Sequence, residues 1–214
     1  MIPIHTVFGV LLVLFAMIGS LRGWAREIIV TFSVALALFV EHVILTFVLP
    51  LRGVFENMPP ESQFYTRGIL FIIITVFGYA SPTIVSQFGA KVVRERLQDL
   101  MLGFFLGAIN GFLVVGTLLS FLSAIHYGVP PDMWSEQQKT EANGEPIVDN
   151  AGNPVTEVVY HPDARGIGGI APPEPDSTAA ALTEFLPPKL IARSNAVLYI
   201  AVAAAFVFVI VVFI

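Results

Sequence analysis

The chain contains 214 residues, of which 56% are hydrophobic and only 13% are charged. An average soluble domain has roughly 45–50% apolar and about 25% charged residues. This composition therefore excludes an ordinary water-soluble enzyme, a disordered regulator and a secreted disulfide scaffold. The sequence contains no cysteine, which excludes disulfides and thiolate metal sites. The formal net charge is −5 without any clustered basic face, so nucleic acid is excluded as a partner.

Five apolar stretches each approach the roughly 20 residues that a helix needs to cross a bilayer. They are residues 2–20, 28–49, 68–88, 100–125 and 196–214. The first stretch has no preceding Lys or Arg and no small-residue cleavage pattern after it, so we interpret it as a retained helix and not as a signal peptide. The predicted fold class is an all-α integral membrane protein with five transmembrane helices. Residues 1–125 form a four-helix membrane core, and residues 196–214 form a C-terminal transmembrane helix.

Basic residues indicate which side of the membrane each connection faces. Five of them lie between the first and second stretches or between the third and fourth stretches: Arg22, Arg26, Lys91, Arg94 and Arg96. Since short cytoplasmic loops are enriched in Lys and Arg, both connections are expected inside. The N-terminus is then outside and the C-terminus inside. The second basic group also fits a short amphipathic helix on the inner surface, facing anionic lipid.

Residues 126–195 separate the fourth and fifth stretches and differ from both in composition. This segment has ten acidic residues against four basic ones, and ten of the fifteen prolines. We predict a long exported acidic loop without an independent core. Within it, residues 144–160 alternate short apolar runs with turn residues, which predicts a small hairpin with its turn near Gly152.

The connection between the first two stretches reads Gly-Ser-Leu-Arg-Gly-Trp-Ala-Arg-Glu, from Gly19 to Glu27. Arg22 and Arg26 are four residues apart, so on one helical turn they would share a face and meet lipid phosphates. Trp24 suits the membrane interface, and Glu27 could pair with Arg26 or cap the second helix. The residues fit a positively charged interface anchor, and a specific ligand or partner site is the alternative.

The fourth stretch contains a ridge of small residues. Gly103, Gly107 and Gly111 are four residues apart, and Asn110 lies beside them. Such spacing exposes backbone along one helical face, so another helix can pack closely there. Asn110 could then form a hydrogen bond with that helix. The partner helix belongs either to the same chain or to a neighbouring subunit.

Glu41 and His42 interrupt the apolar second stretch, and ionisable groups within a membrane helix are candidates for function. Three interpretations are open: structural pairing or snorkelling, proton or ion handling, and ligation of a cofactor by His42. The histidine has no metal-ligand partner at useful spacing, so neither a metal site nor a cofactor is assigned. Pro82 is expected to kink the third helix.

Two of these segments together resemble the colicin V production family (CvpA-like) of bacterial inner-membrane proteins. Residues Gly19 to Glu27 are similar to the family's Arg-Gly-x-x-Arg-Glu signature, and Asp99 to Leu113 are similar to its glycine-rich fourth helix. The resemblance covers residues 1–125. It implies a four-helix core in the bacterial inner membrane, a link to toxin production or secretion and envelope function, and no established catalytic chemistry. The matching positions are Arg22, Gly23, Arg26, Glu27, Gly103, Gly107 and Gly111.

The sequence contains none of the common catalytic or nucleotide-binding motifs. We therefore expect a non-enzymatic scaffold or accessory subunit of a larger membrane assembly. Its expected partners are the lipid bilayer, anionic lipids at the cytoplasmic face and other membrane protein subunits. The alternative is a transporter or channel component with Glu41 and His42 in its path.

Overall fold

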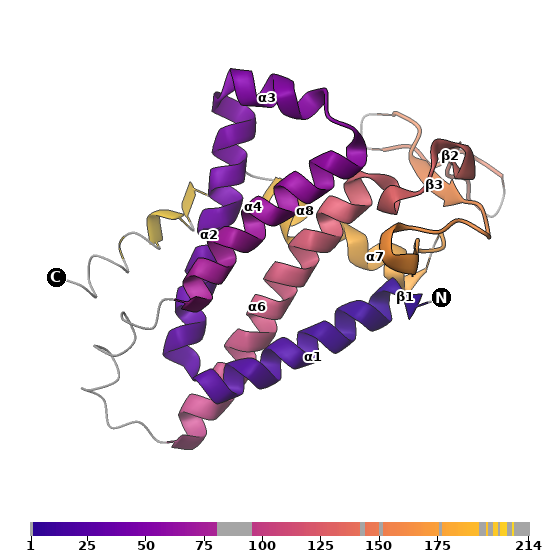
Figure 1. Cartoon of the computed structure of the whole chain (residues 1–214). Helices are drawn as coiled ribbons and strands as arrows, with labels where there is room; N and C mark the ends of the chain where they lie inside the picture. The colour runs from indigo at the N-terminus through magenta and orange to yellow at the C-terminus, as the bar shows by residue number, and fades with distance from the viewer. Residues whose placement is uncertain are drawn as a thin grey trace.

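The structure, a computed structural model, describes residues 2–80, 96–141, 144–149, 152–175 and 177–192, together with residues 196, 199, 200, 202–204 and 207. In this part of the chain four helices are long and apolar enough to cross a membrane: α1 (Ile4–Arg22), α2 (Trp24–Phe47), α4 (Pro60–Ala80) and α6 (Arg96–Ala124) (Figure 1). They correspond to the first four predicted stretches, and the mostly helical membrane architecture is as predicted. Pro82, Lys91, Arg94 and most of the predicted fifth helix lie outside the described residues.

Helix α6 is the centre of the membrane part. It packs against α1 along one side and against α2 along another, and α4 covers α2. Helices α1 and α2 meet at Gly23 and diverge from there, as Figure 1 shows. At the opposite end of α2 the short helix α3 (Leu49–Glu56), with Pro50 in its first turn, leads into α4. The α1–α2 turn and the start of α6 therefore lie at one end of the helices, and α3 lies at the other.

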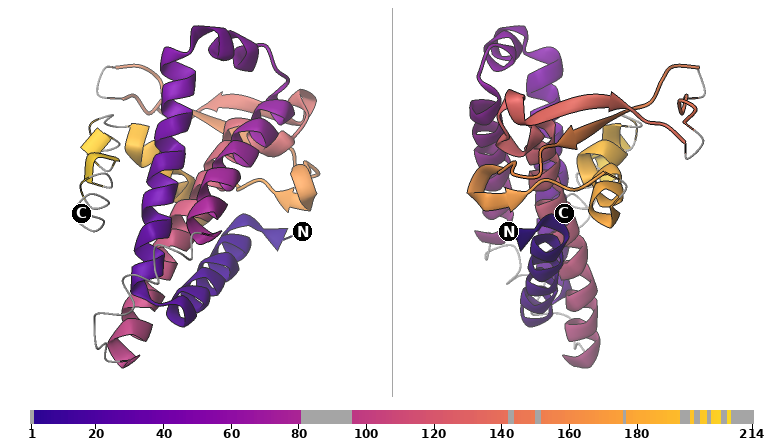
Figure 2. Two further views of the ribbon diagram at one scale, coloured as in Figure 1. Left: turned by 60° about the vertical axis from the view of Figure 1, so that its left-hand side comes forward. Right: turned by 90° about the vertical axis from the view of Figure 1, so that its right-hand side faces the viewer.

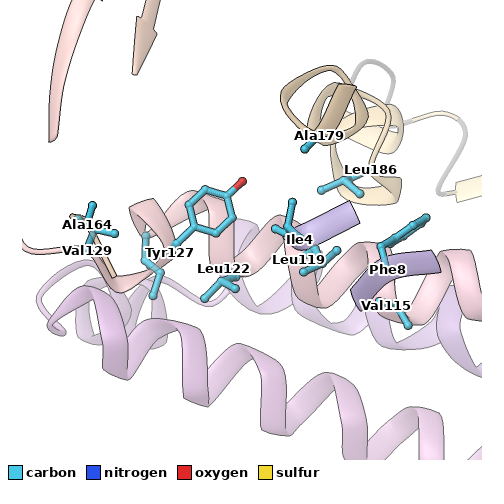
Figure 3. Close-up of a cluster of buried hydrophobic side chains, with 11 residues drawn as sticks. Ile4, Phe8, Val115, Leu119, Leu122, Tyr127, Val129, Ala164, Ala179 and Leu186 are labelled. Atoms are coloured by element: carbon cyan, nitrogen blue, oxygen red, sulfur yellow. The ribbon is translucent and has the colours of Figure 1, made fainter. Parts of the chain in front are cut away.

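Two clusters of buried apolar side chains hold these helices together. One joins α2, α4 and α6 and consists of Val30, Val34, Ala37, Leu38, Phe71, Val114 and Phe121. The other joins α1 and the second half of α6 to the segment that follows, and it includes Ile4, Phe8, Leu119, Leu122, Tyr127, Ala179 and Leu186 (Figure 3). The second cluster means that the non-membrane part shares its core with the membrane helices.

The segment after α6 combines short helices and strands. In chain order these are η1 (His126–Gly128), η2 (Pro131–Met133), β2 (Trp134–Gln138), β3 (Thr156–Tyr160), η3 (Ile167–Gly169), β4 (Ile170–Ala171), α7 (Thr178–Glu184) and α8 (Pro187–Ala192). Strands β2 and β3 are antiparallel, with Trp134 opposite Tyr160. The N-terminal strand β1 (Ile2–Pro3) pairs in parallel with β4, so the N-terminus lies at the same end of the molecule as the β2–β3 ribbon (Figure 2).

The turn expected near Gly152 forms between Asp149 and Asn153, where the Asp149 amide donates to the Asn153 carbonyl over 2.8 Å. Gly152 has φ +83°, a value that glycine adopts at little cost. A second turn of the same kind, between Glu141 and Glu145, was not predicted. Because two turns follow one another, the segment is more than one hairpin over residues 144–160, and its last strand pairs with β2.

Candidate functional site

The turn between α1 and α2 consists of a single residue. Gly23 has φ +83°, and a Cβ at this position would lie 2.7 Å from the Asp99 carboxylate of α6. Only glycine fits both conditions without strain. The Trp24 amide, at the start of α2, donates to Oδ1 of Asp99 over 3.3 Å. A side chain from α6 therefore caps the N-terminus of α2, where unpaired amides need an acceptor.

This turn changes the expected position of the two arginines. Because Gly23 ends α1, Arg22 and Arg26 belong to different helices and do not share a helical face. Arg26 is exposed, whereas Arg22 points inward and only 20% of its side chain is exposed. The prediction of one basic face that contacts lipid is therefore wrong for Arg22, and Arg26 alone is placed as an interface anchor would be.

Glu27 is the centre of a buried polar network, with 1% of its side chain exposed. Arg22 Nη1 donates to Oε1 of Glu27 over 3.0 Å, and Asn110 Nδ2 donates to Oε2 over 2.8 Å. The same Asn110 nitrogen lies 2.9 Å from the Glu27 carbonyl oxygen, and Oδ1 of Asn110 accepts from the Thr31 hydroxyl over 2.7 Å. Glu27 was expected either to pair with Arg26 or to cap the second helix. The pairing with Arg26 is wrong, because adjacent residues on a helix point in different directions and the carboxylate is bonded to Arg22 and Asn110. The acceptor for the Trp24 amide at the start of α2 is Asp99.

Arg22 extends the network to the third membrane helix. Its Nη2 donates to the Tyr79 carbonyl over 3.3 Å, and its Cζ lies 4.4 Å from the centre of the Tyr79 ring. The guanidinium group thus combines an ion pair, a hydrogen bond and a cation–π contact. With Arg22 in α1, Glu27 in α2, Tyr79 in α4 and Asn110 in α6, the network connects all four membrane helices of the described chain.

The glycine ridge of α6 lies against α1 of the same chain. A Cβ on Gly107 would lie 2.5 Å from the Phe15 carbonyl oxygen and 2.9 Å from Cα of Gly19, and a Cβ on Gly111 would lie 2.7 Å from Cβ of Phe15. Gly103 faces the carbonyl of Gly19 even more closely. The two backbones are therefore in direct contact, and the alternative of a neighbouring subunit at this face is not what the structure shows.

Glu41 forms a second ion pair, at the other end of α2. Its Oε1 accepts a hydrogen bond from Nε of Arg67 in α4, and the Arg67 Cζ lies 4.4 Å from the centre of the Phe121 ring. His42 points elsewhere: its Nε2 lies 3.4 Å from the hydroxyl of Tyr199. Glu41 and His42 therefore contact different partners although they are adjacent in sequence, and no group of three metal-ligating side chains is found in the described ranges.

The profile of the family described as colicin V production protein matches residues 4–140. The chain belongs to the colicin V production protein family. The matched region contains all four membrane helices and the whole Glu27 network, so the two predicted family segments lie within it. No curated protein and no solved structure matches the chain.

Several residues of the family core were not found by sequence analysis. Thr31 lies one helical turn after Glu27, and that spacing of four is a signal that was available. Asp99 and Arg67 gave no such signal, because each one forms its hydrogen bond with α2, which is distant from it in the sequence. Of the predicted lipid-facing bases, only Arg96 falls within the described residues, and it begins α6.

Proposed function

We propose that this member of the colicin V production family is a non-enzymatic, multi-pass protein of the bacterial inner membrane. Its role is that of a scaffold or accessory subunit of a larger membrane assembly. The observation that carries the proposal is the distribution of ionisable groups along α2. Glu27 pairs with Arg22 and Glu41 pairs with Arg67, so both carboxylates of the helix are neutralised within the chain.

The two ion pairs are far apart. Glu41 lies fourteen positions after Glu27 along α2, which corresponds to about 21 Å at the rise of an α-helix. Val30, Val34 and Ala37 lie between them, and at most 1% of each of these residues is exposed. A proton or ion path needs closely spaced polar groups or water. Packed apolar side chains between two ion pairs instead favour a structural role.

The outer faces of the membrane helices support a scaffold role in a different way. On α4, Ile69, Ile73 and Phe77 are each more than half exposed, and α1 exposes Val13 and Met17 to a similar extent. In a bilayer these faces contact lipid or the helices of another protein. Because the two carboxylates of α2 are already paired within the chain, these apolar faces are the surfaces available to partner subunits.

We further propose five transmembrane helices with the N-terminus outside and the C-terminus inside. The end of the bundle with the α1–α2 turn carries Arg26 and the start of α6, which favours the cytoplasmic side. The ring of Tyr199 lies 6.2 Å from that of Phe39, and its hydroxyl approaches His42. These contacts are in the half of α2 that is farther from the basic turn, which supports a fifth helix that enters the membrane from outside.

The absence of native cysteine makes this topology directly testable. A single cysteine at Glu145→Cys, in the exposed first turn, is expected to react with a membrane-impermeant maleimide in intact spheroplasts. Gln87→Cys, between α4 and α6, is expected to react only after permeabilisation. Reaction of both variants from the same side would overturn the proposed orientation.

Two measurements test the scaffold role. Native mass spectrometry after mild detergent extraction is expected to show a defined, stoichiometric set of membrane subunits bound to the chain. In proteoliposomes, Glu41→Gln and His42→Gln are expected to leave ion flux at the level of the parent protein. A pH-dependent flux that either amide abolishes in folded protein would instead establish the rival function, a transporter or channel component with these residues in its path.

A further inference from the structure

The β2–β3 ribbon has two strands in the described chain, so each strand has one edge that no other strand covers. In the right-hand view of Figure 2, β3 lies between β2 and the short helices α7 and α8. The outer edge of β3 therefore faces these helices, whereas the outer edge of β2 faces away from them. A strand edge presents a row of backbone N–H and C=O groups that can pair with a further strand.

The register of the ribbon shows which backbone groups of β3 point to this outer edge. The His161 amide donates to the Met133 carbonyl and the Lys139 amide donates to the Val155 carbonyl, each over 2.8 Å. Because bonded and non-bonded pairs alternate in an antiparallel ladder, the hydrogen-bonded pairs across the ribbon are those of its odd-numbered residues. The N–H and C=O groups that point away from β2 are therefore those of three residues of β3: Thr156, Val158 and Tyr160.

These outward groups open into a cavity of about 420 Å³. The cavity is lined by Thr156, Glu157, Val158 and Tyr160 of β3 and by no residue of β2, so it runs along the outer edge of β3. Within the described chain, no backbone hydrogen bond to the three outward residues is found. Backbone groups in such a position need a partner, which is either water or a ligand.

The other walls of the cavity contain residues that cannot complete the β ladder. Pro173 and Pro175 line one wall, and proline has no N–H group to donate to a carbonyl of β3. Ala180 and Ala181 of α7 line another wall, and their short side chains leave space beside the strand. The outer edge of β3 is therefore open to a segment that does not belong to these walls.

A buried tyrosine also indicates a polar ligand in the cavity. Tyr127 lines the cavity and is 3% exposed, yet its hydroxyl has no hydrogen-bond partner in the described chain. In Figure 3 this hydroxyl points to the side of α6 on which Ala179 of α7 also lies. The ring packs edge-on against Tyr160, with the centroids 5.9 Å apart. Burial raises the pKa of both hydroxyls, that of Tyr160 to about 12, so both are protonated near neutral pH and can donate to a carbonyl oxygen.

The charged residues of the walls do not require a charged ligand. Lys139 and Glu157 form an ion pair with each other, with 3.8 Å between Nζ and Oε2. Lys189, the remaining charged lining residue of the described chain, is exposed to solvent. With backbone groups on one wall, a phenol on another and alanines on a third, the cavity suits a neutral chain of alternating N–H and C=O groups with small or apolar side chains.

We propose that the outer edge of β3 binds an extended, neutral segment of another protein, which adds to the ribbon as a third strand with small or apolar side chains toward α7. Its N–H and C=O groups pair with those of Thr156, Val158 and Tyr160, and the Tyr127 hydroxyl donates to one of its carbonyl groups. Residues 156–160 span about 14 Å, so about five residues of the segment lie along the edge. The proposal goes beyond the scaffold role and does not rest on it, because a transporter or channel could bind the same segment outside the membrane.

The test uses the full chain in lipid nanodiscs and, as the probe, the peptide Val-Thr-Val-Thr-Val-Thr blocked at both ends. Isothermal titration calorimetry measures binding, with empty nanodiscs as the blank. Two further peptides carry ester oxygens in place of the N–H groups of two valines or of two threonines. Because alternate N–H groups of a strand point to opposite edges, only one of these two sets faces β3. We therefore expect the affinities of the two ester peptides to differ about tenfold, since one of them loses two hydrogen bonds to β3 and the other loses none.

Proline substitutions test the same edge from the side of the protein. Val158→Pro removes an outward N–H group and leaves the ladder to β2 intact, and it is expected to weaken binding of the all-amide peptide about tenfold or more. The matched control is Glu136→Pro, at the residue opposite Val158 in the register, because its N–H group points to the outer edge of β2. This control is expected to leave binding unchanged. Tyr127→Phe is expected to weaken binding roughly threefold to tenfold, the effect of one neutral hydrogen bond.

Three results would overturn the proposal. One is the absence of binding of the all-amide peptide to the parent protein at millimolar concentration. Another is equal affinity of the two ester peptides, which would mean that side chains alone are recognised and that no strand is added. The last is equal binding by Val158→Pro and the parent protein when their thermal midpoints show that both are folded. The ester peptides are measured on the parent protein, so they decide the question even where Val158→Pro does not fold.

Discussion

Glu27 accepts hydrogen bonds from Arg22 and Asn110 while it is enclosed by three helices. Removing its carboxylate leaves the partly buried guanidinium of Arg22 without a counter-charge, and losing one partner of a buried ion pair costs about 3–5 kcal/mol. We therefore expect Glu27→Ala to lower the free energy of unfolding in detergent by about 3 kcal/mol. Arg26→Ala, one position away but exposed, should change it by less than about 0.5 kcal/mol.

A double-mutant cycle tests whether Arg22 and Glu27 act together. Arg22→Gln with Glu27→Gln removes both charges, so neither is left buried without its partner. The combined loss of unfolding free energy is expected to be clearly smaller than the sum of the two single losses. Additive losses, measured in the same detergent, would mean that the two residues contribute independently and that the network does not act as a unit.

At the scale of single residues, sequence reasoning identified most of the important side chains and few of their partners. Glu27, Glu41 and Asn110 were found because polar groups are conspicuous in apolar helices. Their contacts depend on how the helices are rotated about their axes, and a sequence pattern does not specify this rotation. Asp99 shows this most clearly, because it caps a helix that begins 75 residues earlier.

The contact between α1 and α6 depends on glycine at the crossing. We expect Gly107→Ala to destabilise the protein by about 1–3 kcal/mol. The added methyl group would meet backbone atoms of α1, and these cannot move aside as the end of a flexible side chain can. Gly9→Ala is the matched control: Gly9 also lies in a membrane helix, and its Cβ would meet nothing within 4 Å. Equal thermal midpoints for the two variants would show that the helices do not approach as closely as described.

A second glycine, Gly116 of α6, allows the short helix α8 to pack closely against the membrane part. A Cβ on Gly116 would lie 2.6 Å from Cδ of Pro187, so Gly116→Leu is expected to push α8 away from α6. Ala179→Cys, at a position 6% exposed, can report this movement in a chain without other cysteines. Maleimide should label the cysteine slowly in the parent background and several-fold faster with Gly116→Leu, whereas Gly53→Leu, in open space on α3, should leave the rate unchanged.

At the scale of elements, hydrophobic stretches predicted the four membrane helices, but not every boundary. Helix α4 begins at Pro60, eight residues before the predicted start at 68. The apolar stretch begins only after the charged Arg67, whereas in the structure Arg67 lies inside the helix and pairs with Glu41. The doubled turn of the ribbon had a signal that was missed. Residues 140–147 and 148–155 read Thr-Glu-Ala-Asn-Gly-Glu-Pro-Ile and Val-Asp-Asn-Ala-Gly-Asn-Pro-Val, an eight-residue repeat with Gly and Pro at equivalent positions.

The molecule as a whole is organised by contacts between its N-terminus and the segment after α6. Strand β1 pairs with β4, and Ile4 and Phe8 belong to the same buried cluster as Ala179 and Leu186. Composition alone predicted an exported loop without a core of its own. It could not show that this segment shares a buried apolar cluster with α1 and α6. The apolar residues that the segment contributes to this cluster are few and widely spaced in the sequence.

Pairing of β1 with β4 also places the N-terminus beside the segment that follows α6. Pro3 is opposite Ala171 in the register, so cysteines at Pro3→Cys and Ala171→Cys are neighbours. A short bis-maleimide is expected to join them within one chain, and cleavage of the linked chain at a protease site inserted after Gly152 should then leave the two fragments covalently attached. Arg26→Cys with Ala171→Cys is the control that also spans the cleavage site. Ala171 lies beside Pro3, so the length of α1, 19 residues or about 28 Å, separates these two positions. Linkage in the control pair but not in the first would mean that β4 lies beside the basic turn and away from the N-terminus. It would also place the N-terminus and the ribbon on opposite sides of the membrane, contrary to the proposed topology.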